Sequence, residues 1–132
     1  MTALLDTLPY ARFLGLISNQ DGDVLTVTMP FADQLIGNPF PRKLHGGSTA
    51  AMLEFTAVAQ VALLFPRLHL PRPINVTVAY LRPGKPTDVT ARARISRAGR
   101  RVAHVIAEAW QDDPANPIAS LTTNFLLSDD NA

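Results

Sequence analysis

The sequence predicts an α+β fold in which an antiparallel β-sheet wraps around one long central helix. Residues 47–65 contain no proline and no glycine after the first position, and they are rich in alanine and leucine, which favour helix. β-Like segments follow at about 74–82, 86–97, 101–112 and 117–127. One helix followed by antiparallel strands that run on as a meander indicates a sheet packed around that helix.

The first third of the chain predicts short helical turns and then a hairpin. Residues 3–14 are mostly apolar and predict a short helix or two helical turns. Residues 14–18 and 24–29 flank an Asp-Gly pair at 21–22, which is a strong hairpin signal. Residues 30–44 contain three prolines and are expected to form a loop that leads to the helix.

The rest of the chain predicts strands within a single domain. Residues 90–96 alternate small or apolar with polar or basic side chains, as a half-exposed strand does. Turn-forming residues at 98–99 and 112–117 separate neighbouring strands. The 132 residues can bury a sizeable core and show no repeat or linker, so we expect one domain over 1–132.

Composition excludes several classes of function. Twelve basic and 11 acidic residues give a net charge of +1, which offers no general attraction to nucleic acid or an anionic membrane. The absence of cysteine excludes disulfides and thiolate catalysis. The N-terminus has no basic start and no uninterrupted apolar run, so no secretory signal is expected and the cytoplasm is the default location.

The stretch 47–65 is apolar on every side, which is typical of a buried or a membrane-spanning helix. Glu54 and Gln60 inside it argue against a membrane span, and we predict a buried central helix. Glu54 is the only charged residue between positions 45 and 67. A charge in an apolar interior is costly unless it is paired or functional. Alternatively, Glu54 is an ordinary surface acid on a face that meets solvent or a partner subunit.

The start of this helix is the second candidate feature. Gly46 and Gly47 allow a ligand to approach the backbone closely. The first N–H groups of a helix lack internal partners and carry the positive end of its dipole. They suit a carbonyl oxygen that becomes negative during acyl transfer. The alternative is a plain entry turn that Ser48 or Thr49 caps.

The His-Gly-Gly triplet at 45–47, with Glu54 nine residues after the histidine, resembles the signature of hotdog-fold thioesterases. The segments 35–41 and 75–83 resemble the phenylacetate-pathway (PaaI-like) acyl-CoA thioesterase group, and the resemblance extends from about residue 14 to residue 127. It implies the hotdog fold, with an antiparallel sheet around one helix. It also implies an enzyme that hydrolyses an acyl-CoA thioester to free acid and CoA. The small alanines near Glu54 and the aromatics Phe40, Phe55 and Tyr80 permit a medium-chain or aryl acyl group without choosing between them.

The resemblance further implies roles for four residues. The Gly46 N–H would be the oxyanion donor, and Glu54 would act as general base or nucleophile. His45 would position the thioester or the loop, and Asn38 would contact the substrate or the attacking water. Alternatively, His45 is a helix-entry residue bonded to the backbone and Asn38 is a turn residue. No metal and no separate cofactor is implied, since coenzyme A is part of the substrate.

The spacing of Gly46 and Glu54 predicts a site between two subunits. Eight residues separate them, which is about 12 Å along one helix. A reacting carbonyl must lie about 3 Å from both the donor and the catalytic group. A second, antiparallel copy would bring its Glu54 opposite the first Gly46, and a two-fold homodimer would then hold two equal sites. Whether such dimers pair into a homotetramer, a dimer of dimers, stays open.

The remaining candidates are substrate contacts. Arginine and lysine suit the phosphates of coenzyme A, although a solvated basic rim is an equal alternative. These basic candidates are Arg82, Lys85, Arg97 and Arg100. The other candidates are Gly47, the aromatic Tyr80, Val58 at a position where some relatives carry threonine, and Asn75 near a position where others carry serine.

Two other functions compete with hydrolysis. A hotdog-fold hydratase or dehydratase resembles a different pattern, with a histidine some fourteen residues before the acid, where this chain has Phe40. A non-catalytic acyl-CoA-binding protein is favoured by the missing hydroxyls. A thioesterase assay over a panel of acyl-CoAs would separate the enzyme from the binding protein.

Overall fold

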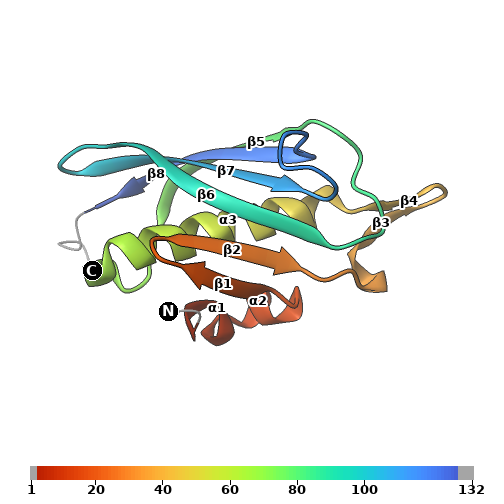
Figure 1. The fold of residues 1–132 in the computed structure, drawn as a ribbon, viewed down its shortest axis with the longest axis horizontal. Helices are drawn as coiled ribbons and strands as arrows, with labels where there is room; N and C mark the ends of the chain where they lie inside the picture. Colours follow the sequence, from red (N-terminus) through yellow and green to blue (C-terminus); the bar gives the residue numbers. More distant parts are fainter. Residues whose placement is uncertain (1–2, 128–132) are drawn as a thin grey trace.

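A computed structural model describes residues 3–127 and shows a six-stranded antiparallel sheet wrapped around one long helix (Figure 1). The helices are α1 (Ala3–Thr7), α2 (Pro9–Phe13) and α3 (Gly46–Leu64), with short 3-10 turns η1 (Asp33–Leu35) and η2 (Pro66–Leu68). The strands are β1 (Ile17–Asp21), β2 (Val24–Met29), β3 (Ile36–Pro39), β4 (Arg42–Leu44), β5 (Pro73–Tyr80), β6 (Val89–Ala98), β7 (Val102–Trp110) and β8 (Ala119–Leu126). The predicted α+β class is therefore confirmed, and its arrangement is that of the hotdog fold.

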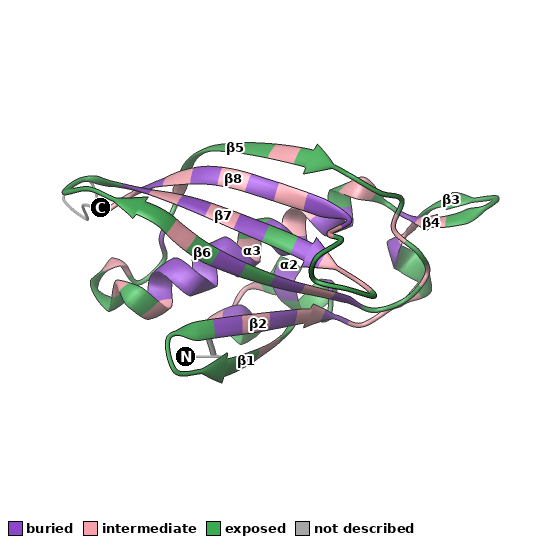
Figure 2. Cartoon of the chain, turned by 45° about the horizontal axis from the view of Figure 1, so that its top comes forward, coloured by how far each residue is buried: buried purple, intermediate pink, exposed green. Residues whose placement is uncertain are grey.

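Helix α3 is the core element, as predicted, and its ends lie within one residue of the predicted ones. Among the described residues it is the one helix long and apolar enough to cross a membrane, yet 61% of its most apolar 18-residue window is buried inside the chain. The inner face of the sheet packs on it, with Leu25, Leu121 and Phe125 fully buried. Strands β7 and β8 alternate buried and partly exposed side chains, because one face meets the core and the other does not (Figure 2).

Gln60 is a buried polar residue that ties α3 to the sheet. Its Oε1 accepts a hydrogen bond from the Leu25 N–H at 2.9 Å, and its Nε2 donates to the Asp23 carbonyl at 2.6 Å. The side chain is only 3% exposed. Because both halves of its amide are paired, Gln60 is satisfied in the core and fixes the helix against the β1–β2 hairpin.

The order of the six-stranded sheet is β1-β2-β6-β7-β8-β5, and this corrects the simple meander that the sequence predicted. Strands β6, β7 and β8 do follow one another. Strand β5, however, pairs with β8 at the far edge instead of with β6. The neighbour of β6 is β2, so the segment between β5 and β6 carries the chain across the sheet. Local patterns predict strands, but pairing between distant strands decides their order.

Two predicted boundaries were wrong. The first strand was expected at 14–18 and lies at Ile17–Asp21, where polar side chains are tolerated because β1 is an exposed edge strand. The expected loop at 30–44 contains the β3–β4 hairpin, which forms a separate two-stranded sheet beside the start of α3. Its prolines did not prevent pairing, since an edge strand tolerates a residue without an N–H.

Candidate active site

The first turn of α3 is organised by His45, which is the N-cap residue of the helix. Its Nδ1 accepts a hydrogen bond from the Gly47 N–H at 2.8 Å, so this nitrogen carries no proton. Ser48 and Thr49, which the sequence offered as alternative caps, do not perform this function. The Ser48 hydroxyl instead donates to the His45 carbonyl at 2.7 Å. Of the two roles that the sequence suggested for His45, the structure therefore shows the helix-entry residue bonded to the backbone.

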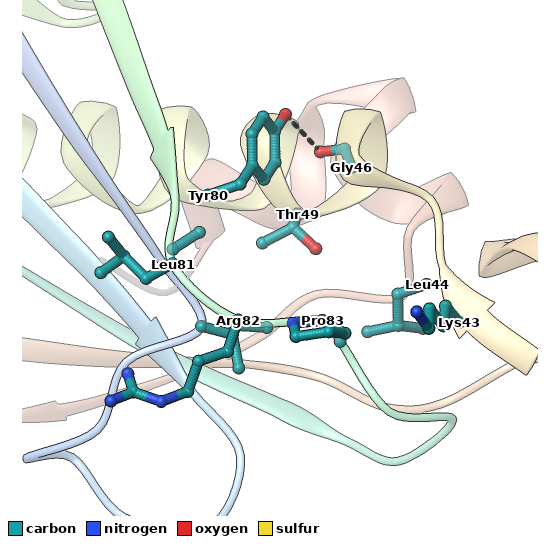
Figure 3. A pocket seen from close by; sticks show the side chains of 11 residues that line it. Lys43, Leu44, Gly46, Thr49, Tyr80, Leu81, Arg82 and Pro83 are labelled. Atoms are coloured by element: carbon teal, nitrogen blue, oxygen red, sulfur yellow. Dashed lines mark hydrogen bonds between the residues drawn. The ribbon is translucent and has the colours of Figure 1, made fainter.

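Gly46 is held by Tyr80 from the opposite side. The Tyr80 hydroxyl donates to the Gly46 carbonyl at 3.0 Å (Figure 3). A Cβ atom at Gly46 would lie 3.0 Å from the Tyr80 ring, and one at Gly47 would lie 2.8 Å from His45 Nδ1. Both distances are shorter than normal contacts, so the glycines serve close packing at this turn.

In the first turn of α3, the Gly46 N–H is the donor that has no hydrogen-bond partner within residues 3–127. It is the first amide of α3, and no acceptor in the described part of the chain pairs with it. The next amide, that of Gly47, is occupied by His45. A helix N-terminus with a free amide offers a donor to a negative or polarised oxygen.

A hollow of about 390 Å³ opens beside this turn (Figure 3). Gly46 and Tyr80 line it together with Thr49, which the sequence analysis considered only as a cap. Thr49 follows Gly46 by three residues, which places both on one face of a helix, and this spacing could have predicted that Thr49 lines the same site. A second hollow of about 530 Å³ shares Arg82 with the first and reaches Lys85. The two hollows together connect the start of α3 with three basic side chains, Lys43, Arg82 and Lys85, and with the acids Asp112 and Asp113, and of these bases Arg82 and Lys85 are the predicted contacts.

Those two basic side chains already have partners. Arg82 donates to the Pro117 carbonyl at 2.8 Å, and Lys85 forms an ion pair with Asp112 at 2.8 Å. Both lysine and aspartate side chains are more than half exposed, so this pair is screened by water and is weak. Arg82 also donates to the Asn116 Oδ1 at 3.5 Å, and since a guanidinium has five N–H donors, three remain for a ligand.

Glu54 lies on the face of α3 that the sheet leaves uncovered. Its side chain is exposed, and Gly47, Ala50 and Ala51 on the same face are exposed or half-buried. No hydrogen bond or ion pair joins its carboxylate to any of residues 3–127. Within one chain Glu54 is thus a surface acid on a face of small residues, which is the alternative that the sequence left open. Val58, one turn later, is 5% exposed.

Asn38 acts within the β3–β4 hairpin. Its Oδ1 accepts a hydrogen bond from the Phe40 N–H at 3.1 Å, as a turn residue does. Phe40 is 89% exposed. The hairpin passes directly into His45, and Gly37 lies so close that a Cβ there would be 2.7 Å from the His45 Cα. Asn38 therefore belongs to a segment packed against the helix start.

Three of the predicted substrate contacts, Asn75, Arg97 and Arg100, do not line the hollow beside Gly46 of their own chain. Asn75 lies near the start of β5, where its Oδ1 accepts from the Asn124 backbone N–H and side-chain Nδ2, both at 3.2 Å. Arg97 and Arg100 lie at the β6–β7 turn, at the end of the molecule where α3 finishes (Figure 1). The described residues also contain no group of three metal-ligating side chains.

The fold and the free amide at the helix start define a hotdog protein of the thioesterase superfamily. The family described as acyl-CoA thioesterase N-terminal domain matches residues 38–126, and the chain belongs to this family. The match includes Asn38, the glycine pair and Glu54. It supports a thioesterase-type function. No curated protein matches the sequence.

Solved structures agree with this assignment. A protein from Chromobacterium violaceum is 33% identical, with 96% of this chain and 88% of that chain covered and a TM-score of 0.78. A Shewanella oneidensis protein related to the thioesterase superfamily is 27% identical, with 96% and 92% covered and a TM-score of 0.82. A phenylacetic acid degradation-related protein from Ralstonia eutropha is 25% identical, with 93% and 96% covered and a TM-score of 0.78.

Proposed function

We propose that the protein hydrolyses acyl-CoA thioesters with medium-chain or aryl acyl groups to the free acid and CoA. The observation that carries the proposal is the free Gly46 amide beside a hollow that continues to Arg82 and Lys85. Such an amide stabilises the oxyanion of acyl transfer, and basic side chains suit the phosphates of coenzyme A. The family match and the phenylacetic acid degradation-related neighbour favour the same chemistry.

The proposed reaction begins when the Gly46 N–H donates to the thioester carbonyl oxygen. Glu54 then removes a proton from a water molecule, and the water oxygen attacks the carbonyl carbon. The tetrahedral intermediate collapses, the C–S bond breaks, and the thiolate of CoA leaves and takes up a proton. Alternatively, the Glu54 carboxylate attacks first, and water hydrolyses the resulting anhydride. In both routes one water is consumed and one acid and one thiol are formed.

The reaction requires Glu54 from a second copy, because eight residues separate it from Gly46 on the same helix. Strand β5 supports such pairing, since it is the last strand of the sheet and most of its length is exposed (Figure 2). Ile74 is 59% exposed and Val76 is 39% exposed. Antiparallel pairing of two β5 strands about a two-fold axis would set two α3 helices antiparallel and cover these apolar side chains.

The same pairing gives a role to the basic residues at the far end of the chain. Arg97 and Arg100 lie at the β6–β7 turn, away from the Gly46 hollow of their own chain (Figure 1). A two-fold axis that reverses one copy brings this end of the partner toward the first Gly46. As contacts to coenzyme A they would therefore act from the partner, whereas Arg82 and Lys85 act from the chain that supplies Gly46.

The function is tested by thiol release from a panel of acyl-CoAs that includes short, medium-chain and aryl acyl groups. We expect turnover by the wild type and only background release by Glu54→Ala. Equal background rates for both proteins would reject hydrolysis. Binding of acyl-CoA without turnover would support the alternative, a non-catalytic acyl-CoA-binding protein, which the buried apolar Val58 favours.

The shared site is tested with a mixed dimer of Gly46→Pro and Glu54→Gln chains. Proline removes the Gly46 N–H, fits the first helical position and follows His45 in an extended conformation (φ −69°, ψ 128°). Gly46→Ala is the matched control, because it adds the same Cβ against Tyr80 but keeps the N–H. Activity of about one site per mixed dimer is expected. An inactive mixed dimer would show that the site does not form between subunits.

A further inference from the structure

We infer that Tyr80 and His45 clamp the peptide group between Gly46 and Gly47 and thereby aim the Gly46 amide at the substrate. The inference rests on the proposed function, because it assigns positioning residues to that site. The carbonyl of this peptide accepts from the Tyr80 hydroxyl at 3.0 Å, and its N–H donates to His45 Nδ1 at 2.8 Å. We call this arrangement of His45, Gly46, Gly47 and Tyr80 the peptide clamp.

The peptide clamp adds two hydrogen bonds to a peptide group that already belongs to the first turn of α3. Glycine peptides at a helix start have no side chain to restrict them. Here both ends of the peptide are bound, one from the chain just before the helix and one from strand β5. The adjoining peptide, which carries the Gly46 N–H, is held at its other end, because the His45 carbonyl accepts from the Ser48 N–H at 3.1 Å and from the Ser48 hydroxyl at 2.7 Å. An amide fixed before the substrate arrives stabilises an oxyanion without a reorganisation cost.

The peptide clamp also selects one of two adjacent donors. His45 occupies the Gly47 N–H, so that this amide cannot point into the hollow. The Gly46 N–H keeps no partner in residues 3–127. His45 thus acts on the reaction through the backbone, as a positioning residue, and its Nδ1 must stay unprotonated to do so.

Tyr80 is suited to this task because its own backbone is anchored. The N–H groups of Leu81 and Arg82, directly after it, both donate to the Ile118 carbonyl, at 2.8 and 3.1 Å. Its ring also lies against the Gly46 Cα, where a Cβ would be only 3.0 Å away. Yet Tyr80 is 58% exposed. Burial therefore does not force its hydroxyl to find a partner, and the bond to Gly46 reflects the placement of β5.

Kinetics test the role of Tyr80. Tyr80→Phe keeps the ring and removes the hydroxyl. Losing one neutral hydrogen bond should lower kcat by about three- to tenfold, with KM changed less than twofold for short and long acyl groups alike. Tyr10→Phe is the matched control, because Tyr10 is the only other tyrosine. An unchanged kcat, or a KM that shifts with acyl size, would instead make Tyr80 an acyl contact and overturn the inference.

Amide exchange tests the peptide clamp without any activity. Glycine-selective 15N labelling gives signals from only seven residues. In the wild type the Gly47 amide should exchange slowly and the Gly46 amide quickly. Tyr80→Phe and His45→Ala should speed exchange at Gly47, and His45→Asn should restore protection, because asparagine also accepts as an N-cap. Unchanged exchange at Gly47 in both loss variants would refute the peptide clamp. If the expected exchange pattern is observed but the wild type releases no thiol from any acyl-CoA, only the proposed function is refuted.

Discussion

The polar residues on the two faces of α3 differ in their burial and in their hydrogen bonding. On the covered face, Gln60 is 3% exposed and both halves of its amide are hydrogen-bonded to the β1–β2 hairpin. On the open face, Glu54 is exposed among small residues and has no partner in the described chain. Both stand out as polar residues in the same apolar stretch of sequence.

The difference separates a structural polar residue from a candidate functional one. A buried amide whose oxygen and nitrogen are both hydrogen-bonded stabilises the fold and is not accessible to a ligand. An exposed carboxylate without a partner in the described chain, on a face of small residues, is still available to a ligand or to a second copy. The predictions below test this distinction between the two faces.

The largest effect is expected from Glu54→Gln, which keeps the shape and removes the base. Thioesterase activity should fall by about 10²- to 10⁴-fold, since a neutral amide cannot take a proton from water. The melting temperature should stay within about 2 °C, because surface substitutions change stability little. Initial rates and thermal unfolding provide the two measurements. A large loss of stability would show that Glu54, like Gln60, stabilises the fold.

The reciprocal change on the covered face, Gln60→Glu, should have the reverse effect. A carboxylate there would face the Asp23 carbonyl, to which Gln60 now donates. We expect a loss of about 3 kcal/mol in the free energy of unfolding, measured by urea denaturation. Activity per folded molecule should be retained. Gln20→Glu, at an exposed position on β1, is the matched control and should leave stability unchanged.

An intermediate effect is expected from Val76→Lys on the exposed edge strand β5. A charged side chain on an edge disfavours strand addition. The dimer dissociation constant should rise by about tenfold or more, as one unfavourable contact of 1.4 kcal/mol would produce, and activity should fall with the dimer population. Light scattering over a dilution series measures this. Val24→Lys is the control, since Val24 on β2 is 45% exposed. Full activity from a Val76→Lys monomer would contradict a shared site.

The smallest effect is expected from Lys85→Met, which keeps the unbranched shape of the side chain, shortens it by one atom and removes its charge. KM for acyl-CoA should rise by about threefold, in the range of an exposed ion pair, and the difference should shrink at high salt. The thioester of N-acetylcysteamine, which lacks phosphates, should show no change. An equal rise of KM for both substrates would mean that Lys85 stabilises the loop by its ion pair with Asp112 and does not bind a phosphate of coenzyme A.

The fold was largely predictable because its signals are local. The apolar run of α3 and the Asp-Gly hairpin before β2 each identify an element by a few neighbouring residues. The β3–β4 hairpin was missed because its prolines are typical of loops, and only its packing beside His45 stabilises the pairing. The edge position of β5 was missed as well, since strand order depends on partners far away in the sequence.

The candidate site was predictable only in part. The glycine pair and Glu54 are visible as a motif, and the helical spacing alone predicts that two chains must share the site. A His45 side chain bonded to backbone was one of the two alternatives that the sequence offered, and the structure shows it. The hydrogen bond from the Tyr80 hydroxyl to Gly46 was not predictable, because 34 residues separate the two. The intersubunit site stays a prediction.

The sequence by itself determined which residues can do chemistry: a glycine pair at a helix start, and one carboxylate in an apolar helix. Side-chain type and helical spacing are properties of the chain, so they are readable without a structure. Only the folded structure decided which of these groups are still free. The neighbouring His45 side chain occupies the Gly47 amide, and the distant β1–β2 hairpin occupies the Gln60 side chain, whereas the Gly46 amide and Glu54 have no partner within residues 3–127.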